Sequence, residues 1–175
     1  MDKLRLRFQK TGKAVYISHL DLMRVVQRIF LRAGTPIKYS EGFNPHALIS
    51  ILLPLSVGVG SVCELMDFRV TRDVDLAALP GELNAVSPEG VRFLTAYEPE
   101  RKAALIKWLR VRCEFEYDAR DTAALLPELE AYFAAPQVTV TRRTKRGEGE
   151  FNLAPNLRDA AWTAEPGLIT LECLI

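Results

Sequence analysis

The chain has 175 residues, of which 49% are hydrophobic and 26% are charged, with a formal net charge of +1. This composition is typical of one or two globular domains and excludes a disordered or fibrous chain. There is no apolar stretch of the ~18 residues that span a membrane and no signal-peptide core, and the three cysteines are isolated, so we expect a cytoplasmic protein with reduced thiols and no membrane contact.

The first predicted elements are a strand and a helix. Residues 4–8 alternate between apolar and basic or polar side chains, which predicts a half-buried strand with a basic outer face. Ser18 stands three residues before Asp21, a capping-box pattern that predicts a helix start. Apolar residues then recur at helical spacing until Gly34 and Pro36, which end the helix.

Further strands and a second helix follow. The sequence predicts a buried strand at 47–53, strands at 62–70 and 90–98, and a helix at 73–86. The order β-α-β, β-α-β is typical of a ferredoxin-like split β-α-β sandwich of the α+β class. We assign this domain, including its basic face, to residues 1–98.

A second series begins after the charged linker PERKAA. It contains a predicted strand over 110–117, an amphipathic helix over 120–133, a strand over 137–143, the segment FNL after the basic tip and a strand-like end over 168–175, in the order β-α-β-β-β. We expect residues 105–175 to form a second ferredoxin-like α+β domain that is incomplete, because its closing helix and strand are missing. The apolar end of the chain also predicts that residues are missing after it. A basic tip in this part is either a solvated loop or a phosphate clamp, and it comprises Arg142, Arg143, Lys145 and Arg146.

Positive charge is concentrated near the amino terminus. Residues 1–50 carry nine basic and three acidic residues, a net charge of +6 against −5 for the remainder. On the first predicted helix, Arg24, Arg28 and Arg32 recur every four residues, away from the apolar face. Such local charge attracts phosphate groups, because screening acts over about 8–10 Å at physiological salt.

Residues 38–46, KYSEGFNPH, combine turn formers with aromatic and cationic side chains. The turn formers fit a tight connection from a helix to a buried strand. A turn does not require Lys38, Tyr39, Phe43 or His46, and exposed rings beside cations also suit base stacking with phosphate contacts. Both interpretations remain open.

The only two histidines are His19 and His46. A catalytic triad is not expected at Ser18, His19 and Asp21, because the serine and the aspartate would cap backbone N–H groups. His19 is either a base at a helix start or a residue without a role. In a ferredoxin-like layout His46 need not meet it. Metal-ligand spacings and nucleotide-binding glycine motifs are also missing, so we expect no metal and no cofactor.

The chain resembles a known family, most strongly over residues 5–70 and more weakly over the rest. From RFQKTG to VCELMDF it is similar to the bacterial radical SAM-linked domain of unknown function, through SHLDL, the arginine-rich helix, S-x-GF-x-PH and PL-x-x-G-x-x-S-x-x-E-x-x-D. The family-typical positions are Ser18, His19, Asp21, Arg24, Ser40, Gly42, Phe43, Pro45, His46, Gly58, Ser61, Glu64 and Asp67. The resemblance implies a fused or neighbouring radical SAM protein as partner. It also implies work on RNA, since relatives often neighbour genes for an E/G-type ribonuclease and a large-subunit ribosomal protein.

Three functions follow as hypotheses. The first is an RNA-binding or substrate-presenting partner of a radical SAM enzyme that acts in tRNA or rRNA modification or processing. The second is a metal-independent endoribonuclease with His46 or His19 as general base, by analogy of fold. The third is a protein adaptor without RNA contact. The residues expected to bind RNA or a partner are Arg5, Arg7, Arg24, Arg28, Arg32, Lys38, Tyr39, Ser40, Phe43, His46, Glu64 and Asp67.

Overall fold

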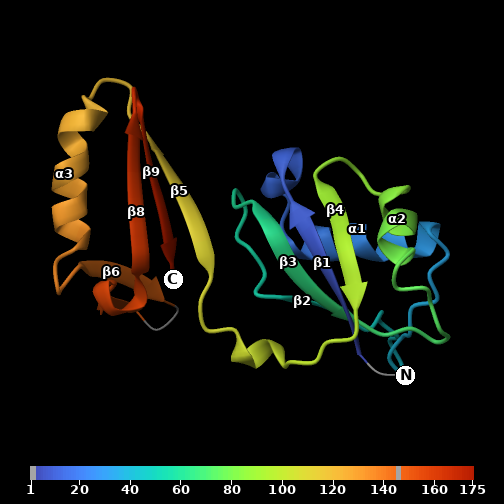
Figure 1. Cartoon of the computed structure of the whole chain (residues 1–175). Coiled ribbons are helices and arrows are strands. Elements are labelled where there is room, and N and C mark those ends of the chain that lie inside the picture. Colours follow the sequence, from blue (N-terminus) through green and yellow to red (C-terminus); the bar gives the residue numbers. More distant parts are fainter. Residues whose placement is uncertain (1–2, 145–146) are drawn as a thin grey trace. The chain divides into compact units, whose positions relative to one another are not determined.

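A computed structural model describes residues 3–144 and 147–175, so Lys145 and Arg146 of the expected basic tip lie outside the described residues. The chain divides into two compact units, Met1–Ala103 and Ala104–Ile175 (Figure 1). None of the described helices is long and apolar enough to cross a membrane.

The first unit is a four-stranded sheet with two helices. Its elements are β1 (Leu4–Lys10), a 3-10 turn η1 (Gly12–Tyr16), α1 (His19–Arg32), β2 (Ile49–Leu52), β3 (Ser61–Phe68), α2 (Leu79–Asn84) and β4 (Val91–Tyr97). The strand order is β2-β3-β1-β4, and all pairs are antiparallel. Thus β1 and β2 run in the same direction with β3 between them, which confirms the predicted ferredoxin-like split β-α-β arrangement.

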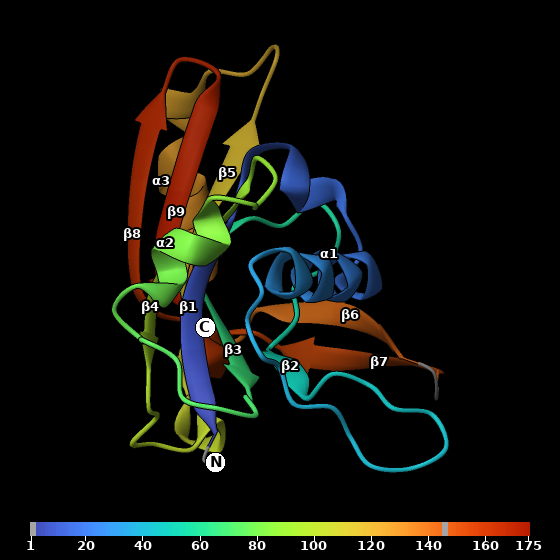
Figure 2. The same ribbon diagram turned by 90° about the vertical axis from the view of Figure 1, so that its right-hand side faces the viewer.

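Both helices cover one face of this sheet (Figure 2). The cap predicted for α1 is present, because the Ser18 hydroxyl accepts a hydrogen bond from the backbone N–H of Asp21 at 3.1 Å. At the centre of the core, the ring of Phe30 lies 5.4 Å from that of Phe68 and 6.4 Å from that of Phe93. This packing fixes α1 against β3 and β4.

Two predicted elements differ from the observed ones. The segment predicted as a buried strand is an edge strand, β2, in which only Ile51 is buried. The helix predicted over 73–86 is reduced to the short α2. Its expected first turn is a separate turn instead, in which the Asp75 carboxylate accepts hydrogen bonds from the backbone N–H groups of Ala77 and Ala78.

The second unit repeats part of the same motif. Its elements are β5 (Arg110–Glu116), α3 (Thr122–Phe133), β6 (Thr139–Thr144), β7 (Gly147–Asn152), a short 3-10 turn (Ala154–Asn156), β8 (Arg158–Glu165) and β9 (Leu168–Leu174), and another 3-10 turn, Ala103–Leu105, spans the boundary between the units in the sequence. The sheet order is β5-β9-β8, antiparallel, so β5 and β8 run in the same direction on either side of β9. The β6–β7 hairpin is inserted before β8. Within the described residues of this unit there is one α-helix, α3, and β6 and β7 form a two-stranded sheet apart from the three-stranded one.

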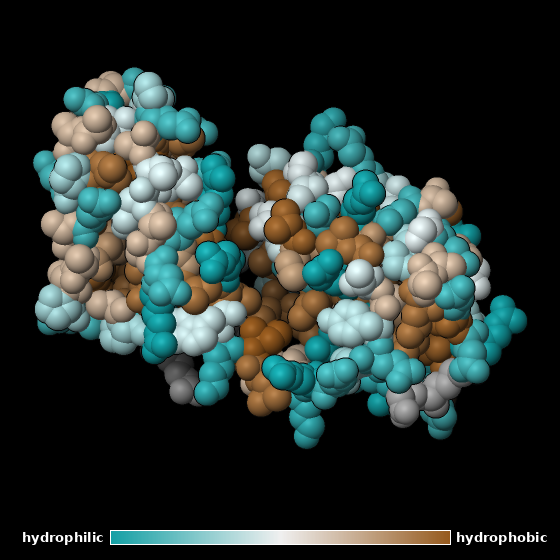
Figure 3. All heavy atoms as spheres, in the orientation of Figure 1, coloured by the Kyte–Doolittle hydropathy of each residue, from teal (hydrophilic) through white to brown (hydrophobic). Residues whose placement is uncertain are grey.

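Hydrophobic and hydrophilic residues are intermixed over the visible surface of each unit (Figure 3). On the first unit, several large apolar side chains are exposed. They include Tyr16, Leu20, Leu31, Tyr39, Phe43, Leu53, Val57, Val59 and Val62. Exposure of an apolar side chain alone therefore does not identify a binding site on this unit. The charged and polar groups around the side chain are also needed.

Gly90 allows β4 to pass close to the turn after β1. Its φ is +88°, and a Cβ there would lie 2.4 Å from the Thr11 carbonyl oxygen. Gly58 has the same φ, but a Cβ there would meet nothing within 4 Å. We expect Gly58→Ala to cost about 1–2 kcal/mol from left-handed strain, and Gly90→Ala to cost about 1–3 kcal/mol more from the clash. Chemical denaturation of both variants checks this, and equal losses would contradict it.

Candidate functional site

Residues 38–48 form a short hairpin, called here the 38–48 hairpin. Tyr39 and Ala47 form an antiparallel bridge, and the backbone N–H of Ser40 donates to the carbonyl oxygen of His46 at 2.8 Å. In Figure 2 the hairpin lies in the cyan segment that projects from the body of the first unit between α1 and β2. Gly42 at the tip has φ +129°, as the turn interpretation requires, and the Phe43 side chain beside it is 110% exposed. KYSEGFNPH is therefore a turn that also presents an aromatic ring to solvent.

Ser40 and His46 are joined at the base of this turn. The Ser40 hydroxyl accepts the backbone N–H of His46 at 3.0 Å and lies 2.8 Å from the ring atom Nδ1. When the hydroxyl donates its single proton to Nδ1, the neutral ring carries its own proton on Nε2. In that arrangement the exposed ring is a hydrogen-bond donor, which suits an anionic ligand better than general-base catalysis.

The arginines of α1 lie on its exposed face. Arg24 pairs with Asp21 at 2.9 Å on the surface, with side chains 67% and 54% exposed. Hydrogen bonds from Ser18 and Arg24 lower the pKa of Asp21. Among the residues that the structure describes, no ion pair joins Arg28 or Arg32 to a carboxylate. Arg28 and Arg32 are therefore the arginines of α1 whose positive charge can interact with a ligand.

Arg5 is not part of an exposed basic face, because it is only 6% exposed. Its Nε lies 2.6 Å from Oδ1 of Asp67, its Nη2 lies 3.1 Å from Oδ2, and Lys3 also reaches Oδ2 at 3.2 Å. Burial by itself would raise the pKa of Asp67, but the hydrogen bonds from Arg5 and Lys3 outweigh burial and lower it. Arg7, by contrast, is exposed, so the basic outer face predicted for β1 is only partly open.

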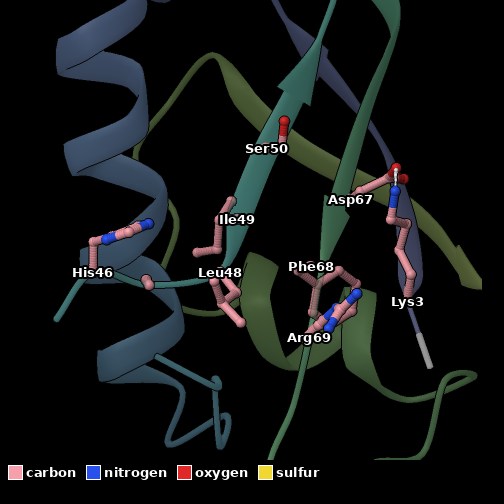
Figure 4. Close-up of a pocket in the computed structure, with 9 residues that line it drawn as sticks. Lys3, His46, Leu48, Ile49, Ser50, Asp67, Phe68 and Arg69 are labelled. Atoms are coloured by element: carbon pink, nitrogen blue, oxygen red, sulfur yellow. Dashed lines mark ion pairs between the residues drawn. The ribbon is translucent and has the colours of Figure 1, made fainter. Parts of the chain in front are cut away.

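A cationic pocket of about 370 Å³ lies beside this ion pair. Its lining residues are Lys3, His46, Ala47, Leu48, Ile49, Ser50, Asp67, Phe68 and Arg69. In Figure 4 the Lys3–Asp67 pair lies at one end and His46 at the other, with Phe68 and Arg69 between them. Because Arg5 and Lys3 neutralise Asp67, the guanidinium of Arg69 leaves the pocket positively charged.

An apolar pocket of about 160 Å³ lies between α1 and the 38–48 hairpin. Its lining residues are Gln27, Phe30, Leu31, Thr35, Pro36, Ile37, Tyr39, Ala47 and Ile49. Thr35 Oγ1 is buried and has no hydrogen-bond partner. Sequence reasoning did not single out Gln27 or Thr35, because a lone amide and a lone hydroxyl form no motif. Tyr39, which lines this pocket, and Lys38 before it belong to the first arm of the hairpin.

Glu64 and His19 line neither of these two pockets. Glu64 and Asp67 lie three residues apart on β3, so their side chains point to opposite faces of the sheet. Glu64 is only 7% exposed. His19 begins α1, whose 14 residues span about 21 Å before the chain turns toward the hairpin. Its Nδ1 is buried without a hydrogen-bond partner. The structure thus gives no pairing of His19 with His46.

Burial raises the pKa of Glu64, although a hydrogen bond from Ser61 and the nearby charge of Lys10 oppose this shift. The folded chain therefore keeps this proton to a higher pH than the unfolded chain, and stability falls as the pH rises from the ordinary value of 4.5 through the folded pKa. We expect Glu64→Gln to remove this fall in urea titrations at a series of pH values. The exposed Glu82→Gln is the control, and an unchanged pH profile in Glu64→Gln would contradict the assignment.

Within the described residues, no three His, Cys, Asp or Glu side chains lie together in a group that could hold a metal ion. The site instead consists of the 38–48 hairpin, the exposed arginines of α1 and the two pockets. We call these parts together the α1–hairpin surface.

Comparison with known proteins identifies the family but gives no activity. No protein with a curated description matches the chain. A family model described as an uncharacterized protein conserved in bacteria, DUF2344, matches residues 3–175. The chain therefore belongs to the bacterial protein family DUF2344.

Proposed function

We propose that the chain binds single-stranded RNA through the α1–hairpin surface. The observation that carries this proposal is the fully exposed ring of Phe43 on a hairpin whose half-exposed Tyr39 lines a pocket together with α1, the helix that carries Arg28 and Arg32. Single-stranded nucleic acids bind where aromatic rings stack on bases and cations track the backbone. The Phe43 ring does not pack in the core, because it is fully exposed, and its faces are therefore free to stack on a base.

Binding fits this surface better than cleavage does. The Ser40–His46 pair orients the imidazole, and in the tautomer in which the Ser40 hydroxyl donates to Nδ1, the ring can donate its Nε2 proton to phosphate oxygens. Arg69 and Lys3 add cations in the cationic pocket. The family resemblance extends the proposal to tRNA or rRNA as ligand and to a radical SAM protein as partner, to which this chain would present the RNA.

The test is fluorescence anisotropy with labelled tRNA, rRNA fragments and a single-stranded oligoribonucleotide at low salt. We expect salt-dependent binding that is weakened by Arg28→Ala/Arg32→Ala. The charge-matched control is Lys13→Ala/Arg92→Ala, which removes two exposed cations elsewhere on the first unit. No binding of any of these RNAs by the unmodified chain at low salt would overturn the proposal.

The same samples test the two other functions. RNA cleavage in EDTA that is lost in His46→Ala would identify an endoribonuclease. Capture of a radical SAM protein after nuclease treatment, without any RNA binding, would identify an adaptor.

A further inference from the structure

The segment Ala47–Ile49 separates two pockets of different chemistry. Ala47 and Ile49 line both of them. One is the cationic pocket with Lys3 and Arg69, and the other is the apolar pocket that Tyr39 helps to line. β2 is an edge strand of its sheet, and the segment Ala47–Leu48 before it pairs with Lys38 and Tyr39 of the 38–48 hairpin.

The apolar pocket has the size of one ring system. Its volume of about 160 Å³ is below the about 300–1,000 Å³ of sites for drug-sized molecules. Its lining residues include two aromatic residues, Phe30 and Tyr39, with Leu31, Pro36 and Ile37. Flat apolar groups pack well against such a wall.

Thr35 lines the apolar pocket and carries a hydroxyl without a partner, and because the hydroxyl oxygen is closed to solvent, rotation about χ1 is needed to turn it toward a ligand. Thr35 Oγ1 is buried without a hydrogen bond, which is costly in a folded protein. Gln27, an exposed residue of α1 with an amide side chain, also lines this pocket. An aliphatic side chain of a partner protein would leave the Thr35 hydroxyl unpaired, whereas the edge of a nucleobase carries donors and acceptors that can pair with it.

The charges around the apolar pocket favour a polyanion. Gln27 and Leu31 line the pocket from α1, and Arg28 lies three positions before Leu31 and four before Arg32, so Leu31 and Arg32 are both neighbours of Arg28 on the helix surface. The cationic pocket lies on the other side of Ala47–Ile49. An unpaired base in the apolar pocket would therefore have cations near the phosphates on both sides of it.

We propose that the apolar pocket receives one unpaired nucleobase of the bound RNA, with Thr35 and Gln27 hydrogen-bonding its edge. This inference rests on the proposed function, because it specifies how RNA occupies the α1–hairpin surface. Phosphate contacts position a strand, and base contacts select its sequence. The apolar pocket is thus the part of the surface that gives base preference.

The test compares oligoribonucleotides that differ in one central base with an oligoribonucleotide that lacks this base. We expect the full chain to prefer one base and to bind the abasic strand at least about 5-fold more weakly. Thr35→Val should remove most of this difference without changing the dependence of affinity on salt, since the substitution leaves the charge unchanged. Gln27→Met, at an exposed helix position, gives a second test that does not depend on a buried residue. Thr95→Val, at an exposed position on β4, is the control.

Methyl NMR locates the bound base directly. We expect the methyl signals of Ile37 and Ile49 to shift on addition of the preferred strand but not of the abasic strand. Equal binding of all strands with unchanged methyl signals would overturn the nucleobase site while leaving RNA binding intact. No RNA binding at all would overturn both proposals. Methyl shifts caused only by a partner protein would assign the apolar pocket to a peptide instead.

Discussion

Replacing Asp67 with asparagine is expected to lower the free energy of unfolding of the first unit by about 3–5 kcal/mol. The reason is the burial of its partner, because the Arg5 guanidinium is 6% exposed and has Asp67 as its bidentate acceptor. The neutral amide would leave a buried cation without a counter-charge. The effect should diminish as the pH falls below the ordinary aspartate value of 3.8, since the lowered pKa of Asp67 means that its stabilising contribution is lost on protonation.

Hydrogen exchange measured by mass spectrometry on peptides from β1 and β3 is the suitable readout. Both tryptophans, Trp108 and Trp162, lie in the second unit, so their fluorescence does not report on the first. Arg5→Met/Asp67→Leu should recover most of the stability, because it removes both charges together. Asp73→Asn, at an exposed position, is the control. A loss in Asp67→Asn no larger than in this control would show that the pair does not hold β1 to β3.

Phe43→Ala is expected to weaken the binding of single-stranded RNA by about 1–3 kcal/mol, the usual contribution of one base stacked on a ring, which is roughly 5- to 150-fold in affinity. The side chain is 110% exposed, so the fold should be unaffected. Because no charge is removed, the dependence of affinity on salt should stay the same.

Tyr16→Ala provides the matched control, since this ring is 73% exposed but belongs to η1 rather than to the 38–48 hairpin. Equal losses in the two variants would indicate nonspecific stacking over the surface. Unchanged affinity in Phe43→Ala would remove the hairpin tip from the binding site. Anisotropy with an unstructured oligoribonucleotide measures both.

Local patterns predicted the first unit well because its elements carry their own signals. Ser18 caps α1 as its spacing to Asp21 indicates, and the alternation of Leu4, Leu6 and Phe8 places them in the core. The strand order then follows from the β-α-β, β-α-β succession, which has few compact solutions. The α+β ferredoxin-like class could therefore be predicted from the order of elements alone.

The remaining features depend on interactions between distant residues. Arg5 was predicted to be exposed by alternation, but Asp67 is 62 positions away in sequence and buries it through an ion pair. β8 was not recognised, because its burial is largely confined to Trp162 and Ala164, and its register with β9 shifts between Arg158 and Ala161. Irregular pairing of this kind weakens the period-two signal of a strand.

The candidate site shows the same division. The sequence analysis identified Phe43 and His46 as residues that a turn does not require. In the structure Phe43 is fully exposed, and His46 is hydrogen-bonded to Ser40. Thr35 and Gln27 could not be identified in this way. They become candidates only because α1 and the 38–48 hairpin enclose a pocket around them.

The central claim is that the α1–hairpin surface binds RNA, and the salt dependence of that binding tests it most directly. The slope of log affinity against log salt for a single-stranded oligoribonucleotide should decrease in magnitude by about 1.4 in Arg28→Ala/Arg32→Ala, at about 0.7 for each phosphate that the protein no longer neutralises. Lys13→Ala/Arg92→Ala should leave the slope unchanged. An identical slope in the unmodified chain and in Arg28→Ala/Arg32→Ala would contradict the account.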